Sequence, residues 1–161
     1  MTRIRSLTFL AAAAVLAVVV SAATASPQVT SSRTATVKVA QRSPGKILVD
    51  SKGRTLYLFR KDSRNKSACF GLCADNWPPL RVSGTPKAGR GVRAGLLGTA
   101  KRSDGKRQVT YNGHPLYRFV GDQGAGDVNG QGFNAFGARW YVVSPSGKAN
   151  TRAATGGGGP Y

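Results

Sequence analysis

The chain has 161 residues, and its 24 Lys and Arg against six acidic residues give a formal net charge of +18. The length suits one modest domain or two very small ones, and it excludes a large multidomain protein. A surface this basic attracts polyanions such as nucleic acid, anionic envelope polymers and anionic lipid headgroups.

Residues 1–25 have the layout of a secretory signal peptide. Arg3 and Arg5 supply a positive start, residues 7–20 form an apolar run, and Ala-Thr-Ala at 23–25 is a cleavage signal. The alternative is an uncleaved anchor, but the run is shorter than the roughly 20 residues of a membrane span. We therefore expect cleavage, no stable membrane span in the mature chain, and a secreted or extracytoplasmic, cell-envelope location.

The expected mature chain keeps 22 of the 24 basic residues, and its net charge is near +16. These residues are scattered singly rather than gathered in one run. Together with the export signal, this argues against a specific nucleic-acid partner and favours anionic cell-envelope polymers. The alternative is a solvated basic surface that serves only to keep the protein soluble.

Cys69 and Cys73 are the two cysteines of the chain. An even count in an oxidising compartment predicts a disulfide. The bridge would close a five-residue loop, for which chain entropy gives about 2 kcal/mol, so we expect it to shape a local turn. A redox-active bridge is the alternative.

An internal repeat organises the rest of the sequence. Residues 57–62 and 117–122 both read Tyr-x-Phe-x-x-Asp, and residues 36–62 match residues 96–122 at 11 of 27 positions. Such a match exceeds chance and predicts two copies of one supersecondary unit. The motif residues are Tyr57, Phe59 and Asp62 in the first copy and Tyr117, Phe119 and Asp122 in the second.

The first unit, residues 36–82, follows a flexible leader at 26–35. Alternating apolar residues and β-branched or aromatic side chains predict three strands, at 36–40, 47–49 and 55–59. In the third strand, Tyr57 and Phe59 face one side and Leu56 and Leu58 the other. Because Leu58 corresponds to Arg118 in the second unit, we expect the Tyr/Phe side to be the buried one.

The second unit, residues 96–146, follows a connection at 83–95. Strands are predicted at 97–100, 108–111, 114–119 and 141–143. Asn112-Gly113 between two of them predicts a type I′ hairpin turn. A disordered glycine-rich tail is expected at 147–161.

These elements predict an all-β fold in which one domain, residues 36–146, is made of two tandem repeats of short antiparallel β-meanders. A unit of roughly 45 residues cannot bury an adequate core alone, so we expect the two to pack about a pseudo-twofold axis. The expected core is aromatic: Tyr57, Phe59, Trp77, Tyr117, Phe119 and Trp140.

Asp62 and Asp122 follow their strands directly, where a carboxylate accepts backbone N–H bonds and caps a turn. The alternative is a carboxylate pair that meets across the pseudo-twofold axis. Asp122, Asp127 and Asn129 lie in a glycine-rich loop that suits a calcium site loosely, without EF-hand spacing; a flexible loop is the other interpretation.

No constellation for catalysis is apparent. His114 is the only histidine; it follows a turn and is expected to be exposed, and both cysteines are expected to be oxidised, so no base–nucleophile pair is apparent. Zinc needs three or four nitrogen or sulfur ligands, and one histidine with two cysteines does not supply them convincingly. We therefore expect a non-enzymatic protein with no cofactor, no metal and no catalytic residues.

The sequence resembles a bacterial secreted and lipoprotein repeat family with a Tyr-x-(Phe/Trp/Tyr)-x-x-Asp motif and unknown function. The resemblance is carried by both motifs, by residues 69–80 and by residues 108–117. It implies no agreed activity, substrate or catalytic residue. This chain lacks a lipid-bearing cysteine near the expected cleavage site, so we expect a secreted or wall-associated product.

The hypothesis that follows is a non-enzymatic binding or structural module of the cell envelope. The alternative hypothesis is an extracytoplasmic redox- or metal-associated protein.

Overall fold

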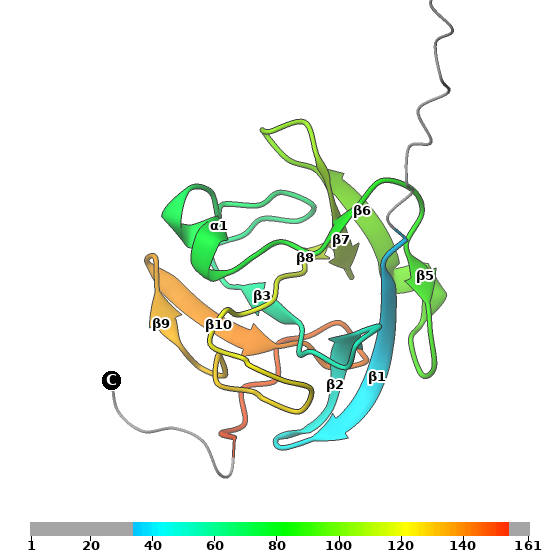
Figure 1. The fold of residues 1–161 in the computed structure, drawn as a ribbon, viewed down its shortest axis with the longest axis vertical. Helices are drawn as coiled ribbons and strands as arrows, with labels where there is room; N and C mark the ends of the chain where they lie inside the picture. Colours follow the sequence, from blue (N-terminus) through cyan, green and yellow to red (C-terminus); the bar gives the residue numbers. More distant parts are fainter. Residues whose placement is uncertain (1–33, 155–161) are drawn as a thin grey trace, which may run out of the picture. The chain divides into compact units, whose positions relative to one another are not determined.

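The structure is a computed structural model that describes residues 34–154, so the expected signal peptide and most of the expected leader lie outside the described residues. The described part is built from strands, one α-helix and one 3-10 turn, which confirms the all-β prediction (Figure 1). In chain order the elements are β1 (Thr36–Arg42), β2 (Gly45–Asp50), β3 (Tyr57–Phe59), α1 (Leu72–Asn76), β4 (Arg81–Val82), β5 (Lys87–Ala88), η1 (Ala94–Leu96), β6 (Leu97–Lys101), β7 (Arg107–Tyr111), β8 (His114–Pro115), β9 (Asn134–Ala135) and β10 (Ala138–Val142).

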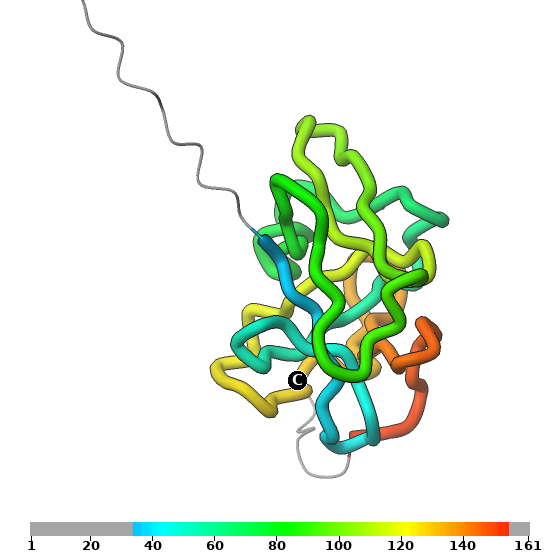
Figure 2. The backbone as a smooth tube through the Cα atoms, turned by 90° about the vertical axis from the view of Figure 1, so that its right-hand side faces the viewer, coloured from blue at the N-terminus to red at the C-terminus, as the bar shows by residue number. Residues whose placement is uncertain are grey.

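The first sheet begins as the predicted hairpin and gains a strand from the connection between the units. β1 pairs with β2 in antiparallel register from Val37↔Asp50 to Arg42↔Gly45. β5, which lies within the connection 83–95, pairs parallel with β1, and the connecting segment runs along that strand in Figure 2. The connection is therefore part of the fold.

The third strand of the first unit departs from the predicted meander. Thr55, two residues before β3, forms one bridge with Val49 of β2, and β3 itself pairs along its length with β10 at the other end of the chain. Its other edge faces the second motif, where Tyr57 and Tyr117 exchange backbone hydrogen bonds of 2.9 and 3.0 Å. Both edges of β3 thus find their partners in the second unit.

The third sheet is also shared between the units. β4 of the first unit pairs with β7 of the second, and β7 also pairs with β6 and β8. The two units therefore form shared sheets and not two separate meanders. Short strands leave backbone donors and acceptors that must be paired when buried, and here each unit supplies partners for the other. A pseudo-twofold axis relating the whole units stays a prediction.

The hairpin turn at Asn112-Gly113 is confirmed. Tyr111 pairs with His114 across it, and φ is 51° at Asn112 and 80° at Gly113. Positive φ at both central residues is the signature of a type I′ turn, for which Asn-Gly is the preferred pair. This turn places His114 directly after the reversal of the chain.

The core has an aromatic and an aliphatic cluster. Five of the six expected aromatic residues are at most 1% exposed, and Phe119 is partly buried against them. Leu56, Leu58 and Leu116 are equally buried, in the aliphatic cluster. The expectation that only the Tyr/Phe side of the third strand is buried is therefore wrong, because β3 has a core cluster on each face.

Four stacked rings join the two units through the aromatic cluster. Phe59 stacks on Trp140 at 4.1 Å between centroids, Trp140 on Trp77 at 3.9 Å, and Trp77 on Phe119 at 4.2 Å. The rings come alternately from the first and second unit. Aromatic pairs add about 0.5–1.5 kcal/mol each beyond the area they bury, so this stack stabilises the interface directly.

The segment that carries α1 is held by a disulfide and by a buried arginine. Cys69 and Cys73 are bonded to each other, with their Cα atoms 5.3 Å apart. Arg102, from the second unit, donates to the carbonyl of Cys69 at 2.6 Å and to Ser67 Oγ at 2.9 Å. A covalent bond and charge-assisted hydrogen bonds therefore fix this loop together.

The first residues of the tail expected to be disordered, 147–152, are ordered against the domain. Asn150 donates its backbone N–H to Val142, and Ala149 forms a bridge with Val143. The side chain of Gln131 donates to the carbonyls of Asn150 and Arg152, which ties residues 144–152 to the domain. We call residues 144–152 the C-terminal strap. Residues 155–161 lie outside the described residues.

We predict that replacing both cysteines, Cys69→Ser with Cys73→Ser, lowers the free energy of unfolding by about 2 kcal/mol, the chain-entropy value for a five-residue loop. The fold should survive, because the hydrogen bonds of Arg102 and the ring stack remain. Urea unfolding of the variant beside the oxidised wild type measures the difference. A variant that does not fold would show that the bridge holds the whole domain and not one loop.

Candidate functional site

The two repeat motifs meet through a pair of crossed hydrogen bonds. Tyr57 Oη donates to Asp122 Oδ2 at 2.7 Å, and Tyr117 Oη donates to Asp62 Oδ2 at 2.8 Å. Each tyrosine therefore bonds the aspartate of the other unit. In the spacing Tyr-x-Phe-x-x-Asp, the tyrosine lies on the strand with its side chain toward the core, and the aspartate follows just beyond the end of the strand. This places a hydroxyl donor and a carboxylate acceptor where the other unit can reach both.

Each aspartate also caps a turn of its own unit, as the sequence predicts. Asp62 Oδ1 accepts the N–H of Ala68 at 2.7 Å, and Asp122 Oδ1 accepts the N–H of Asn129 at 2.9 Å. In the described part of the chain no hydrogen bond or ion pair joins the two carboxylates to each other. The geometry thus supports paired tyrosine–aspartate contacts rather than a joint carboxylate site.

Burial dominates the electrostatics of these pairs. Loss of solvation raises the pKa of Asp62 to about 6, against the opposing effects of the Ala68 N–H, the Tyr117 hydroxyl and Arg102. Burial likewise raises the pKa of Asp122. Burial and the adjacent carboxylates raise the pKa of both tyrosine hydroxyls, so that each stays protonated and remains the donor.

The loop expected to suit calcium is closed by its own hydrogen bonds. Asp127 Oδ2 accepts the N–H groups of Gln123 and Gly124, at 2.8 and 2.9 Å. Asn129 turns its amide nitrogen to the carbonyl of Gly121, and both oxygens of Asp122 are already used. Among residues 34–154 there is no group of three His, Cys, Asp or Glu placed to hold a metal ion. The calcium prediction is not supported.

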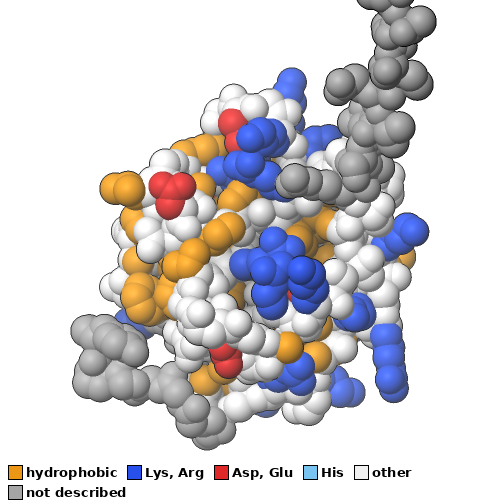
Figure 3. All heavy atoms as spheres, in the orientation of Figure 1, with side chains coloured by type: hydrophobic (Ala, Val, Ile, Leu, Met, Phe, Trp, Pro, Cys, Tyr) orange, Lys and Arg blue, Asp and Glu red, His pale blue; other side chains and the backbone are white. Residues whose placement is uncertain are grey.

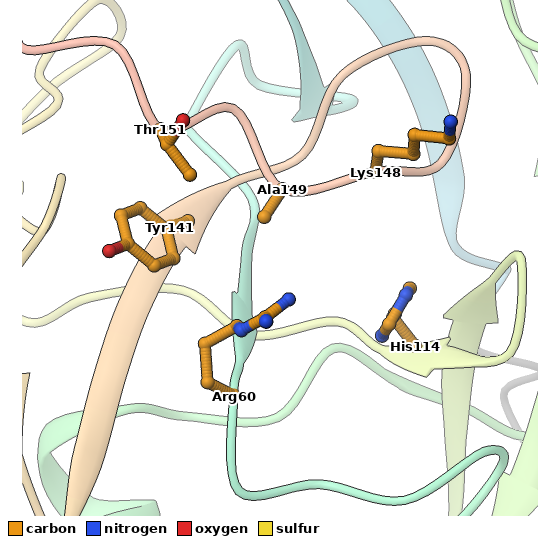
Figure 4. A pocket seen from close by; sticks show the side chains of 6 residues that line it. All are labelled: Arg60, His114, Tyr141, Lys148, Ala149 and Thr151. Atoms are coloured by element: carbon orange, nitrogen blue, oxygen red, sulfur yellow. The ribbon is translucent and has the colours of Figure 1, made fainter.

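A basic hollow of about 320 Å³ lies where the two units and the C-terminal strap meet (Figure 4). It is lined by Arg60, His114, Tyr141, Lys148, Ala149 and Thr151. Arg60 follows β3, His114 lies on β8 and Tyr141 on β10, and the strap supplies the other three. The side chain of Arg60 points between Tyr141 and His114.

The charges of the hollow are uncompensated. No aspartate lines it, and in the described part of the chain neither the guanidinium of Arg60 nor the ammonium of Lys148 has an ion-pair partner. Burial, with the charges of Arg60 and Arg64, lowers the pKa of His114. The imidazole is therefore neutral near pH 7 and offers both a hydrogen-bond donor and an acceptor beside the cations.

Ion pairs elsewhere involve few of the basic residues. In residues 34–154 the aspartates that form them are Asp50, with Arg54 and Arg118, and Asp104, with Arg81 and Arg102. Figure 3 accordingly shows Lys and Arg side chains over much of the right-hand part of this face, with only a few acidic side chains among them. The uneven count of charges, 24 basic to six acidic, makes this unavoidable.

Sequence reasoning places His114 beside a turn but does not assemble the hollow. Arg60 and Lys148 are 88 positions apart, and the strap that carries Lys148 falls in the part of the chain expected to be disordered. The sequence does contain one sign of such a site: the basic residues far outnumber the acidic ones. This surplus indicates an anion-binding surface but does not show where on the molecule it lies.

The disulfide offers little access for redox chemistry. Cys69 is fully buried and Cys73 is 6% exposed. Thiol–disulfide exchange requires a thiolate to reach one of the sulfur atoms, and both are covered here. A structural bridge fits this burial better than a redox-active one.

Within residues 34–154 the structure has no helix with the length and apolar character of a membrane span.

The sequence matches a protein family described as a secreted repeat of unknown function, once over residues 38–81 and again over residues 98–144. The two matches coincide with the two units and together cover more than half of the chain. No curated protein and no solved structure matches the chain.

We predict that Tyr57→Phe and Tyr117→Phe each lower the free energy of unfolding by about 1.5–3 kcal/mol, the range for a hydrogen bond to a charged group. Tyr141→Phe is the matched control, since its hydroxyl has no hydrogen-bond partner among the described residues and its loss should change stability by less than about 0.5 kcal/mol. Chemical unfolding of the three variants measures this. Equal effects in all three would mean that the crossed bonds add nothing.

We also predict a pH dependence that originates at Asp62. Because its pKa is raised to about 6 when folded, the folded state binds more protons than the unfolded state between about pH 4 and 6. This contribution to stability is fully present below pH 4 and is lost as the pH rises through 6.

The stability of the wild type relative to Asp62→Asn should therefore fall as the pH rises across that window. Denaturant unfolding at stepped pH measures the difference, and a carboxyl titration followed by NMR gives the folded pKa directly. A titration midpoint near 4 would contradict the prediction.

Proposed function

The chain belongs to this family of secreted repeats of unknown function, and we propose that it is a non-enzymatic binding module whose basic surface engages anionic polymers of the cell envelope. The observation that carries the proposal is the basic hollow, in which Arg60 and Lys148 lie without acidic partners. An exported mature protein with a net charge near +16 meets such polymers outside the cytoplasm.

The hollow has the chemistry that a phosphate or carboxylate group requires. Two cations supply charge, and Arg60 in particular can donate two parallel hydrogen bonds to the oxygens of one anion. His114 and the hydroxyl of Thr151 add neutral donors at the same place. Tyr141 supplies an aromatic face on which the apolar part of a polymer repeat can pack.

Several weak contacts along a polymer suffice for useful affinity. An exposed ion pair contributes only about 0–1 kcal/mol, so one anionic group in one hollow binds weakly. A polymer presents many such groups at high local concentration, and other unpaired cations, such as Arg64 beside His114, can engage neighbouring groups. Binding is therefore expected to depend strongly on polymer length and on salt.

The redox or metal alternative lacks a comparable observation. The bonded cysteines are buried, and the loop residues Asp122 and Asp127 use their carboxylates within the loop. The polymer-binding proposal is therefore the one that the geometry favours.

The test measures binding of the mature protein to a linear glycerol-phosphate polymer, beside a neutral dextran, over a range of salt concentrations. We expect binding to the phosphate polymer alone, weakening steeply as salt rises. The double variant Arg60→Ala with Lys148→Ala should bind about tenfold more weakly.

The matched control is Lys46→Ala with Lys87→Ala, which removes the same charge from exposed positions outside the hollow. An equal loss in both double variants would mean that binding is diffuse and that the hollow is not a site. Affinity that does not change with salt would contradict the electrostatic account altogether.

A further inference from the structure

The large apolar side chains that remain exposed in residues 34–154 are concentrated around α1, the end of the second motif and the β9–β10 hairpin. They are Phe70, Leu72, Val120, Phe133 and Phe136, with exposed fractions from 37% to 75%. Figure 3 shows apolar side chains gathered on the side of the molecule that carries α1 and β9. We call these five residues the apolar crest.

Direct contacts join the segments that carry the crest. The ring of Phe133 lies 5.5 Å from that of Phe119 and 6.1 Å from that of Trp77, which follows α1. The backbone N–H of Val120 donates to the carbonyl of Asn76, the last residue of α1. The crest is therefore one surface, made by both units and supported from below by the stacked core rings.

Phe136 occupies a backbone conformation that its side chain does not favour. It has φ 57° and is followed by Gly137 with φ 89°, between the paired residues Ala135 and Ala138. These values define a two-residue type I′ turn, in which the first position prefers Asn and a bulky aromatic residue is an outlier. The β7–β8 turn has the same geometry with the preferred pair, Asn112-Gly113.

Burial compensates only in part for this unfavourable backbone conformation. Phe136 is 41% exposed, and its ring stacks on no other ring of the described residues. Residues held in such sparsely populated backbone conformations cluster at functional positions. The hairpin tip thus holds an aromatic side chain toward solvent at a cost to folding.

Two observations indicate what the crest contacts. Leu72, on a helix of five residues, is 75% exposed, and Phe136 stands on a hairpin tip, so both project outward from the domain. Cations accompany them: Lys61 Nζ lies 3.4 Å from the carbonyl oxygen of Phe136, and Arg139 is exposed on β10. Asp75 is the acidic residue on α1.

We propose that the apolar crest inserts into the interfacial region of an anionic lipid bilayer. Projecting aromatic and aliphatic side chains can bury themselves at the boundary between headgroups and acyl chains, where flanking Lys and Arg side chains reach the lipid phosphates. The net charge of the mature chain, near +16, draws the protein to such a surface before insertion. This contact is separate from polymer binding, because it uses apolar residues that do not line the basic hollow.

The test uses the substitution Phe136→Asn, whose effects on folding and on binding have opposite signs. Asn suits the type I′ position, so the midpoint of thermal unfolding should rise by about 4 °C. Loss of the phenyl ring should weaken binding to vesicles of phosphatidylcholine with phosphatidylglycerol by roughly tenfold. Phe136→Trp is the matched rescue variant, which keeps an interfacial aromatic residue and should bind as the wild type does.

Sedimentation of the mature protein with vesicles measures binding, and pure phosphatidylcholine vesicles test the requirement for anionic lipid. The Arg60→Ala, Lys148→Ala double variant should retain vesicle binding to within about threefold, which separates this proposal from the polymer site. If Phe136→Asn is more stable but binds the vesicles undiminished, the crest is not the membrane contact. If the wild type binds neither vesicle, the proposal is overturned in favour of a protein partner for the crest.

Discussion

The crossed hydrogen bonds between Tyr57 and Asp122 and between Tyr117 and Asp62 are the contacts on which the rest of the structure depends. They hold the ends of the two motif strands beside each other, where the backbones of the two tyrosines also pair. Because the other oxygen of each carboxylate caps a turn of its own unit, the same two aspartates that join the units also shape the loops that leave them. Neither unit can keep this arrangement without the other.

The loops that leave the motifs carry the features of functional interest. The loop after Asp62 leads to the disulfide and α1, and the loop after Asp122 closes over the aromatic cluster. At Gly130 a Cβ would lie 2.7 Å from the ring of Trp77, so the chain can approach the stacked tryptophans there only as glycine. The apolar crest is built on these two loops, on the end of the second motif and on the β9–β10 hairpin. The basic hollow lies where Arg60, just beyond β3, meets the C-terminal strap.

The two proposed surfaces have different origins in the sequence: the basic hollow follows from the surplus of basic residues, and the apolar crest from apolar residues that the core does not bury. Basic residues outnumber acids so far that most of those in residues 34–154 have no ion-pair partner, and unpaired cations in a hollow suit anionic groups. Apolar residues outnumber the places that a small core offers, and those left outside gather around α1 and the hairpin. A secreted protein that contacts a charged, lipid-bounded envelope is consistent with both surfaces.

The sequence by itself determined the repeat, the all-β class, the family, the Asn112-Gly113 turn and most of the aromatic core, because these depend on local pattern and on matching residues at constant spacing. It also indicated that Asp62 and Asp122 cap their own turns. Only the tertiary structure decided which strands pair. β3 pairs with β10 and β4 pairs with β7, so each strand pairs with one from the other unit and not with its neighbour in the sequence. The crossed tyrosine–aspartate bonds, the burial of both faces of β3 and the hollow that joins Arg60 to Lys148 follow from that exchange. Long-range pairing is set by which buried edges find partners, and no local pattern in the sequence records it.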